Sequence, residues 1–283
     1  MSTWVWIDGT VAPAEEARIA ATDRGVLLGD GVYETCKVVD GAPFALTRHL
    51  ARLRRSAEII GMPLPWGDSP IRSACAKAVG AALIDGAGDG QVERLRITVT
   101  GGAGPLGPDR GDIQPTLIVA AGPSRTWGPT TDVVSVEWRL NEHRPTVGAK
   151  TTSYLDSLLA LADAHRRGAD EAILCNTAGH LAEGTGSNVF LVVDGELCTP
   201  ALATGCLPGV TRALVCESVE VTERSDLTLD DLRRAPEAFL TSSTRDVHPV
   251  ARVDGIELAT AGGPLTNAAA DAFAAIRART IDP

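Results

Sequence analysis

The alternation of apolar and polar residues changes its period along the chain, and these changes predict a mixture of strands and helices. Stretches with strand-like patterning cover residues 32–39, 95–100, 116–121, 132–138, 171–175, 188–193 and 238–242. Apolar residues at helical spacing predict helices over residues 47–60, from 69 onward, over 153–167, from 208 onward and over 267–279. The pattern therefore favours an α+β chain.

The helix predicted over residues 153–167 has a clear apolar face. Its leucines Leu155, Leu158 and Leu159 recur with Ala162 at helical spacing, and Gly168 follows the predicted end.

The clearest break in the pattern lies between Gly122 and Pro129, where Gly and Pro punctuate the chain. We therefore expect a small N-terminal α/β domain over residues 1–121, a linker over 122–130 and a larger, sheet-rich C-terminal domain over 131–283. Between two predicted strands, the Gly-rich stretch Gly101–Arg110 predicts a flexible loop.

Composition narrows the possible partners. The chain has 283 residues, a formal net charge of −10 and 22% charged residues, which disfavours nucleic-acid binding. No apolar run is long enough to span a membrane, and the N-terminus lacks the pattern of a signal peptide. The six cysteines form no C-x-x-C pair, and the five histidines show no metal-binding spacing. We expect a cytoplasmic protein without a metal site.

Lysine is rare in this chain, which has only Lys37, Lys77 and Lys150 against twenty-three arginines. A lysine can lose its proton and act as a nucleophile or base, whereas an arginine stays charged. Lys150 precedes a predicted helix, and Glu183 follows further along before a strand. The ordinary interpretation of one lysine is a solvated loop charge. An amine followed by a placed carboxylate also suggests Schiff-base chemistry with an aldehyde cofactor.

Pyridoxal phosphate needs an amine, an acid near its pyridine nitrogen and a phosphate site. Lys150 and Glu183 are candidates for the first two. The phosphate candidates are the helix start at Pro208–Thr211, the helical Arg52 and Thr244 in a polar turn. Each has an ordinary surface interpretation when it is taken alone.

Several motifs occur in one order along almost the whole chain. They are Asp23-Arg24-Gly25, Gly29 to Thr35, His49 to Leu53, Lys150 to Leu159, Gly168 to Ala172, Glu183 to Phe190, Thr199-Pro200 and Cys206 to Arg212. On these motifs the chain resembles the class IV aminotransferase family, the fold-type IV pyridoxal-phosphate enzymes. The resemblance implies a small N-terminal α/β sandwich and a larger C-terminal β-barrel-like domain with helices.

The resemblance also implies roles for individual residues. Lys150 would form the Schiff base and move the proton at the substrate α-carbon, and Glu183 would pair with the pyridine nitrogen. The phosphate would be held by Arg52, Val210, Thr211 and Thr244. Tyr154 would lie near the phenolic oxygen of the cofactor, although its spacing from the lysine is one residue shorter than in branched-chain enzymes. A homodimer acting on a small amino substrate is expected, with Gly101–Arg110 as a candidate lid.

The family contains more than one reaction. Thr35, Cys206-Leu207 and the strand before Gly101 resemble 4-amino-4-deoxychorismate lyase of folate biosynthesis, which eliminates pyruvate to give p-aminobenzoate. Glu34 departs from the lyase pattern, and the segment around it resembles D-amino-acid enzymes equally well. The sequence favours the lyase, with a transaminase for branched-chain or D-amino acids and 2-oxoglutarate as the alternative. A binding protein without chemistry is the third hypothesis, which the presence of Lys150 and Glu183 disfavours.

Overall fold

The computed structural model describes residues 3–85, 92–112 and 114–283, which divide into two compact units. Unit 1 comprises Met1–Arg125, Ala149–Tyr154 and Thr280–Pro283, and unit 2 comprises Thr126–Gly148 and Leu155–Arg279. The domain ranges predicted from the sequence place residues 149–154 and 280–283 in the C-terminal domain. That division stays a prediction, and each unit is described by itself below.

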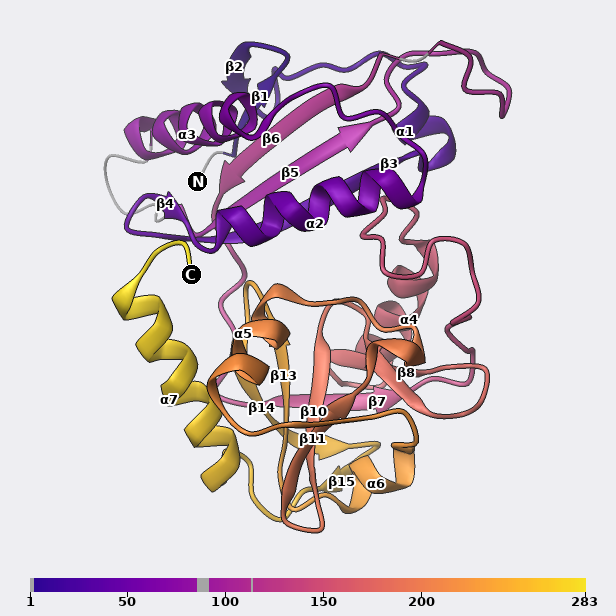
Figure 1. The fold of residues 1–283 in the computed structure, drawn as a ribbon, viewed down its shortest axis with the longest axis vertical. Helices are drawn as coiled ribbons and strands as arrows, with labels where there is room; N and C mark the ends of the chain where they lie inside the picture. Colours follow the sequence, from indigo (N-terminus) through magenta and orange to yellow (C-terminus); the bar gives the residue numbers. More distant parts are fainter. Residues whose placement is uncertain (1–2, 86–91, 113) are drawn as a thin grey trace. The chain divides into compact units, whose positions relative to one another are not determined.

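Unit 1 is built on an antiparallel sheet in the order β2-β1-β6-β5-β3-β4. Its strands are β1 (Trp4–Ile7), β2 (Thr10–Pro13), β3 (Gly31–Val39), β4 (Ala42–Pro43), β5 (Arg94–Thr100) and β6 (Thr116–Gly122). Its helices are α1 (Arg24–Leu28), α2 (Leu46–Ile59) and α3 (Asp68–Asp85). Helices α2 and α3 lie along the sheet (Figure 1) and bury the apolar residues of β3, β5 and β6 in one core.

Helix α2 begins differently from the prediction. Thr47, at the start of the predicted helix over residues 47–60, is an N-cap candidate by residue type, but the helix starts at Leu46 after Ala45, whose side chain makes no capping bond. The carboxylate of Asp282 instead accepts bonds from the Thr47 amide at 2.8 Å and from its hydroxyl at 2.6 Å. A residue distant in sequence thus satisfies an N–H group that the helix leaves without a partner.

Unit 2 is built on a mixed sheet in the order β12-β11-β10-β13-β14-β7-β8-β9, and β15 pairs with β14. Its strands are β7 (Thr131–Ser135), β8 (Glu171–Cys175), β9 (Leu181–Gly184), β10 (Asn188–Val193), β11 (Glu196–Pro200), β12 (Thr222–Arg224), β13 (Ala238–Ser242), β14 (Asp246–Val253) and β15 (Ile256–Glu257). Its helices are α4 (Leu155–Arg166), the short 3-10 helix η1 (Leu202–Thr204), α5 (Val210–Ser218), α6 (Leu229–Arg234) and α7 (Pro264–Arg279). Every residue of β8 is buried, as expected for a strand covered on both faces.

Helix α4 buries alanines and exposes its leucines. Leu155, Leu158 and Leu159 are 66%, 55% and 55% exposed, and the residues buried on this helix are Ala160 and Ala164. Small alanines face the sheet because they permit a close approach of the helix backbone, which leaves the leucines on the outer side.

Among the described residues, no helix combines the length and apolar character needed to cross a membrane. The mixture of strands and helices confirms the α+β expectation.

Candidate active site

The segment that carries Lys150 extends the free edge of β3 in unit 1. The Tyr33 amide donates to the Lys150 carbonyl at 2.9 Å, and the Thr152 amide donates to the Gly31 carbonyl at 2.9 Å. The Lys150 amide in turn donates to Ser56 Oγ of α2 at 3.0 Å. The backbone of the lysine is therefore fixed from two sides, and its side chain is half-buried.

The Lys150 amine lies in a cluster of cations and phenols. Its Nζ is 4.6 Å from the centroid of the Tyr33 ring, and Arg96 Cζ is 3.7 Å from the same centroid. The Tyr154 ring meets the Tyr33 ring edge-on, with centroids 6.0 Å apart. Within residues 3–85, 92–112 and 114–283, no carboxylate forms an ion pair with Lys150 or Arg96. The cluster is therefore suited to an anionic group of a ligand.

The neighbouring charges change the pKa of the Tyr33 phenol. Burial raises its pKa, but the positive charges of Lys150 and Arg96 outweigh that effect and hold the pKa below its usual range. Burial lowers the pKa of Arg96, although a guanidinium stays charged at any pH at which proteins function. Two positive side chains beside an acidified phenol form a locally electropositive site.

Arg52 is held by a buried carboxylate. Glu34 Oε1 accepts from Arg52 Nε at 2.7 Å and Oε2 accepts from Nη2 at 2.6 Å, while His49 Nδ1 lies 2.7 Å from Oε2. Burial raises the pKa of Glu34, but Arg52 and His49 outweigh burial and lower it to about 2. The guanidinium edge used for bidentate pairing thus contacts Glu34, whereas the sequence suggested that Arg52 pairs with phosphate in this way.

Glu183 is held by a backbone amide in unit 2. It lies near the end of β9, half-buried, and its Oε2 accepts from the Leu207 amide at 2.8 Å. Asn188 Nδ2 donates to the Leu207 carbonyl at 2.9 Å. Both polar groups of Leu207 are therefore bonded, and the carboxylate of Glu183 is oriented by the segment that leads into α5.

The N-terminus of α5 fits a phosphate group. Its N-cap is Gly209, which offers no side chain to cap the first amides, and Val210 and Thr211 are buried at the helix start. A Cβ on Gly209 would lie 2.0 Å from Asn188 Oδ1, so a larger residue here would require Asn188 or the helix start to shift. Unpaired N–H groups and the helix dipole favour an anion at such a position.

The seven residues expected from the sequence thus fall into two groups. Lys150 and Tyr154 flank Tyr33, and Arg52 lies one helical turn before Ser56, to which the Lys150 amide donates. Glu183, Val210 and Thr211 are connected through the segment at Leu207. Thr244 lies half-buried in the turn between β13 and β14, and β13 pairs with β10 from Asn188 onward.

Sequence reasoning missed three residues of these groups. Tyr33 and Glu34 lie next to each other on β3, so their side chains point to opposite faces of the sheet. Arg96 is opposite Thr35 in the β3–β5 register, on the same face as Tyr33. The alternation of β3 predicted a strand, but only the pairing with β5 could indicate that Arg96 belongs beside Tyr33.

The chain matches known proteins over nearly its whole length. The sequence model of a family described as amino-transferase class IV matches residues 31–253. A provisionally named branched-chain-amino-acid aminotransferase of Methanocaldococcus jannaschii is 33% identical over 261 residues, covering 89% of this chain and 88% of the relative. A D-alanine aminotransferase of Listeria monocytogenes is 30% identical, covering 93% of this chain and 92% of the relative.

Solved structures show the same architecture. A branched-chain aminotransferase from Thermoproteus uzoniensis, solved with norvaline, has a TM-score of 0.83 and 30% identity, covering 98% of this chain and 95% of that one. A hypothetical aminotransferase from Mycobacterium tuberculosis, in its PLP-bound form, has a TM-score of 0.83 and 27% identity, covering 96% and 98%. These likenesses confirm the fold expected from the sequence.

Proposed function

The chain belongs to the class IV aminotransferase family, and we propose that it is a transaminase for branched-chain or D-amino acids with 2-oxoglutarate as amino acceptor. The family match confirms the predicted enzyme class and the predicted cofactor, pyridoxal phosphate. The substrate assignment is supported by relatives that align over most of the chain and are named for branched-chain amino acids or D-alanine.

The lyase that the sequence favoured has no such support. Each relative and solved structure described above is named for transamination, which favours the alternative hypothesis. Glu34, which departs from the lyase pattern, is the buried partner of Arg52 and His49. The link to folate biosynthesis depends on the lyase and is equally unsupported.

The site residues have complementary roles in this proposal. Bound pyridoxal phosphate supplies an electron sink for the charge that develops at the substrate α-carbon. Lys150 would hold the cofactor through its amine and, once that amine is released, would move the proton at the α-carbon, for which its position beside Tyr33 is suited. Glu183 keeps the pyridine nitrogen protonated, and its carboxylate is oriented for that by the Leu207 amide.

The phosphate is assigned to the N-terminus of α5, at Val210 and Thr211, together with Arg52 and Thr244. The absence of a side-chain cap at Gly209 supports this assignment, because the first amides of α5 can then donate to an anion. The guanidinium of Arg52 is assigned to the phosphate, while Glu34 fixes its Nε and Nη2 edge. Tyr154 is assigned to the phenolic oxygen of the cofactor.

Arg96 is our candidate for binding the carboxylate of the amino-acid substrate. It is charged, lies over the Tyr33 ring and has no ion-pair partner in the described part of the chain. A guanidinium can bind a carboxylate in bidentate geometry. Arg96→Met should therefore raise KM for the amino acid about tenfold or more, while the cofactor affinity stays unchanged. An unchanged KM would remove Arg96 from the site.

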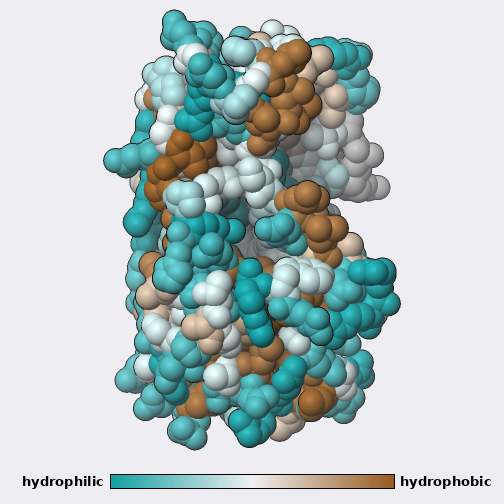
Figure 2. Space-filling model, turned by 90° about the vertical axis from the view of Figure 1, so that its right-hand side faces the viewer, coloured by the Kyte–Doolittle hydropathy of each residue, from teal (hydrophilic) through white to brown (hydrophobic). Residues whose placement is uncertain are grey.

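A homodimer is part of the proposal. Helix α4 exposes Leu155, Leu158 and Leu159, and α1 exposes Val26 to Leu28. Figure 2 shows apolar patches separated by hydrophilic surface on the face that it draws. Exposed leucines of this number on one helix are typical of an interface. Leu158→Glu should shift the protein to monomer in sedimentation velocity, and a monomeric wild type would contradict the proposal.

The decisive experiment compares amino donors. Purified enzyme is supplied with 2-oxoglutarate and either L-leucine, L-valine, D-alanine or D-valine, and glutamate formation is measured. In parallel, 4-amino-4-deoxychorismate is supplied, and pyruvate and p-aminobenzoate are measured. We expect turnover with at least one amino acid and none with 4-amino-4-deoxychorismate. Turnover only in the second assay would refute the proposal in favour of the lyase.

The role of Lys150 is tested separately by reductive trapping. Borohydride treatment followed by peptide mass spectrometry should place the pyridoxyl group on Lys150. The Lys150→Ala variant should remain unlabelled and inactive. Lys77→Ala is the matched control, since Lys77 is an exposed lysine on α3, and it should behave as the wild type. Labelling at another lysine would show that the assignment is wrong.

A further inference from the structure

Gly29 and Asp30 connect α1 to β3, which begins at Gly31, and the carbonyls of Gly29 and Gly31 hold the segment of Lys150. The Gly29 carbonyl accepts from the hydroxyls of Thr152 at 2.8 Å and Ser153 at 3.0 Å. The Gly31 carbonyl accepts from the Thr152 amide at 2.9 Å. A Cβ on Gly29 would lie 2.7 Å from Ser153 Oγ, so the two segments touch along their length.

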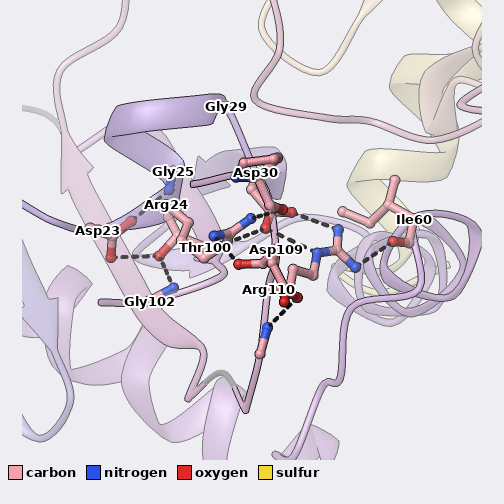
Figure 3. A network of polar contacts seen from close by, with 12 residues as sticks. Asp23, Arg24, Gly25, Gly29, Asp30, Ile60, Thr100, Gly102, Asp109 and Arg110 are labelled. Atoms are coloured by element: carbon pink, nitrogen blue, oxygen red, sulfur yellow. Dashed lines mark hydrogen bonds and ion pairs between the residues drawn. The ribbon is translucent and has the colours of Figure 1, made fainter. Parts of the chain in front are cut away.

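The side chain of Asp30 binds two arginines, Arg24 and Arg110, as Figure 3 shows. Its Oδ2 accepts from Arg24 Nε at 3.0 Å and from Arg110 Nε at 3.0 Å, and its Oδ1 accepts from Arg110 Nη2 at 2.6 Å. The Asp30 side chain is only 9% exposed. One buried carboxylate therefore joins two guanidinium groups that come from different parts of the chain.

Both arginines hold the loop formed by residues 101–111. Arg24 Nη1 donates to the carbonyls of Gly107 at 3.2 Å and Asp109 at 3.0 Å, and its Nη2 donates to Pro108 at 3.0 Å. Arg110 is itself in the loop. A planar guanidinium with several fixed donors is suited to hold successive carbonyls in this way.

Arg110 also connects the loop to the end of α2. Its Nη1 donates to the carbonyls of Ile60 and Gly61, each at 2.8 Å. At the other end of the loop, the Gly101 amide donates to the Asp30 carbonyl at 2.9 Å. The loop is thus attached to Asp30 through its first residue and through Arg110.

We propose that Asp30 is a positioning residue for Lys150, which couples the conformation of loop 101–111 to that of segment 149–154. The carboxylate of Asp30 accepts hydrogen bonds from Arg110 of the loop. The carbonyls of its neighbours Gly29 and Gly31 accept hydrogen bonds from the lysine segment. A change in the loop, such as a substrate contact, then changes the placement of the Lys150 amine. The inference rests on the proposed function only in treating Lys150 as the reactive amine.

The coupling is tested by hydrogen–deuterium exchange of the full-length protein followed by mass spectrometry. Two variants are used, Asp30→Asn and Arg110→Met. Arg110→Met removes the bonds of the loop to Asp30, Ile60 and Gly61, and it leaves the residues that bond directly to segment 149–154, such as Gly29, Gly31 and Ser56, unchanged. Loss of charge-assisted hydrogen bonds should raise local exchange about tenfold or more. We expect this rise in both peptides, 101–111 and 149–154, in both variants.

Asp68→Asn is the matched control, because Asp68 forms an exposed ion pair with Arg54 in the same unit. It should leave both peptides unchanged. The proposal is overturned if Arg110→Met raises exchange in 101–111 and leaves 149–154 as in the wild type. Should Asp30→Asn fail to fold, Arg110→Met alone decides the question.

A kinetic measurement separates positioning from a purely structural role. With the amino donor found for the wild type, Arg110→Met should lower kcat about tenfold while pyridoxal-phosphate affinity is retained, and Arg110→Lys should recover part of kcat. An unchanged kcat would contradict the positioning role. If the wild type performs no transamination, the proposed function fails, but the exchange experiment still confirms or refutes the coupling.

Discussion

The two units hold their site residues by different physical means. In unit 1, Arg52 is fixed by an ionisable side chain, since Glu34 pairs with its guanidinium in the interior and His49 contacts the same carboxylate. In unit 2, Glu183 is fixed by a backbone amide, and the start of α5 has no side-chain cap. A buried charge that loses its partner is costly, whereas a backbone donor remains after any substitution. The first arrangement should therefore be sensitive to mutation in stability, and the second mainly in function.

Glu34→Gln should cause the largest change. The substitution removes the negative charge that balances Arg52, which is buried with 9% exposure. We expect the free energy of unfolding to fall by about 3–5 kcal/mol, measured by urea unfolding of the full-length protein. Glu58→Gln is the control, because Glu58 is an exposed glutamate on α2, the helix that carries Arg52. Its effect on the free energy of unfolding should be within about 0.5 kcal/mol. A Glu34 variant as stable as this control would refute the first half of the comparison.

Acidification should remove the stability that the Glu34 carboxylate contributes. The folded pKa of Glu34 is about 2, below its ordinary value of 4.5, so the stabilisation is present above pH 4.5 and is lost as the pH falls toward 2. The shift corresponds to roughly 3 kcal/mol at neutral pH. The groups that face Glu34 are Arg52 and His49 from α2, with Cys36 nearby on β3. The difference in unfolding free energy between wild type and Glu34→Gln should therefore shrink between pH 4.5 and 2. A constant difference would assign the stabilisation to another group.

Glu183→Gln should affect activity far more than stability. A glutamine oxygen can accept the Leu207 amide in the same way, so the unfolding free energy should change by less than about 1 kcal/mol. The negative charge beside the pyridine nitrogen is lost, and we expect kcat to fall by roughly a hundredfold. Steady-state kinetics with saturating pyridoxal phosphate measures this. Should stability fall as much as in Glu34→Gln, the two units would not differ in the way described.

The sequence predicted local features better than contacts between distant segments. The start of α5 was recognisable because Pro208 and Gly209 precede it directly, and the strands were recognisable by their period. The ion pair of Glu34 and Arg52 was not recognisable from the sequence, because it joins a strand to a helix and depends on how these two elements pack. The orientation of α4 does not follow from its leucines, because these are among its exposed residues.

The cap of α2 illustrates the same limit. Thr47 was a reasonable N-cap by residue type, yet Asp282 accepts the hydrogen bond from its amide. No local pattern around residue 47 could indicate a partner near the end of the chain. Of the site itself, the motif residues could be proposed from their order, while Tyr33, Glu34 and Arg96 required the strand register of unit 1.

Gly209→Ala should give the smallest effect, and it tests the second half of the comparison most directly. Gly209 has φ −65° and ψ 138°, which alanine adopts without backbone strain. The added Cβ would lie 2.0 Å from Asn188 Oδ1, so Asn188 or the start of α5 must shift. We expect pyridoxal-phosphate affinity to fall about tenfold, in line with an overpacking cost of about 1–3 kcal/mol, measured by fluorescence titration of the apoenzyme.

Gly80→Ala is the control, because a Cβ there meets nothing within 4 Å in helix α3. It should leave affinity unchanged and stabilise the fold by about 0.5–1 kcal/mol. Unchanged affinity in Gly209→Ala would mean that the start of α5 does not hold the phosphate.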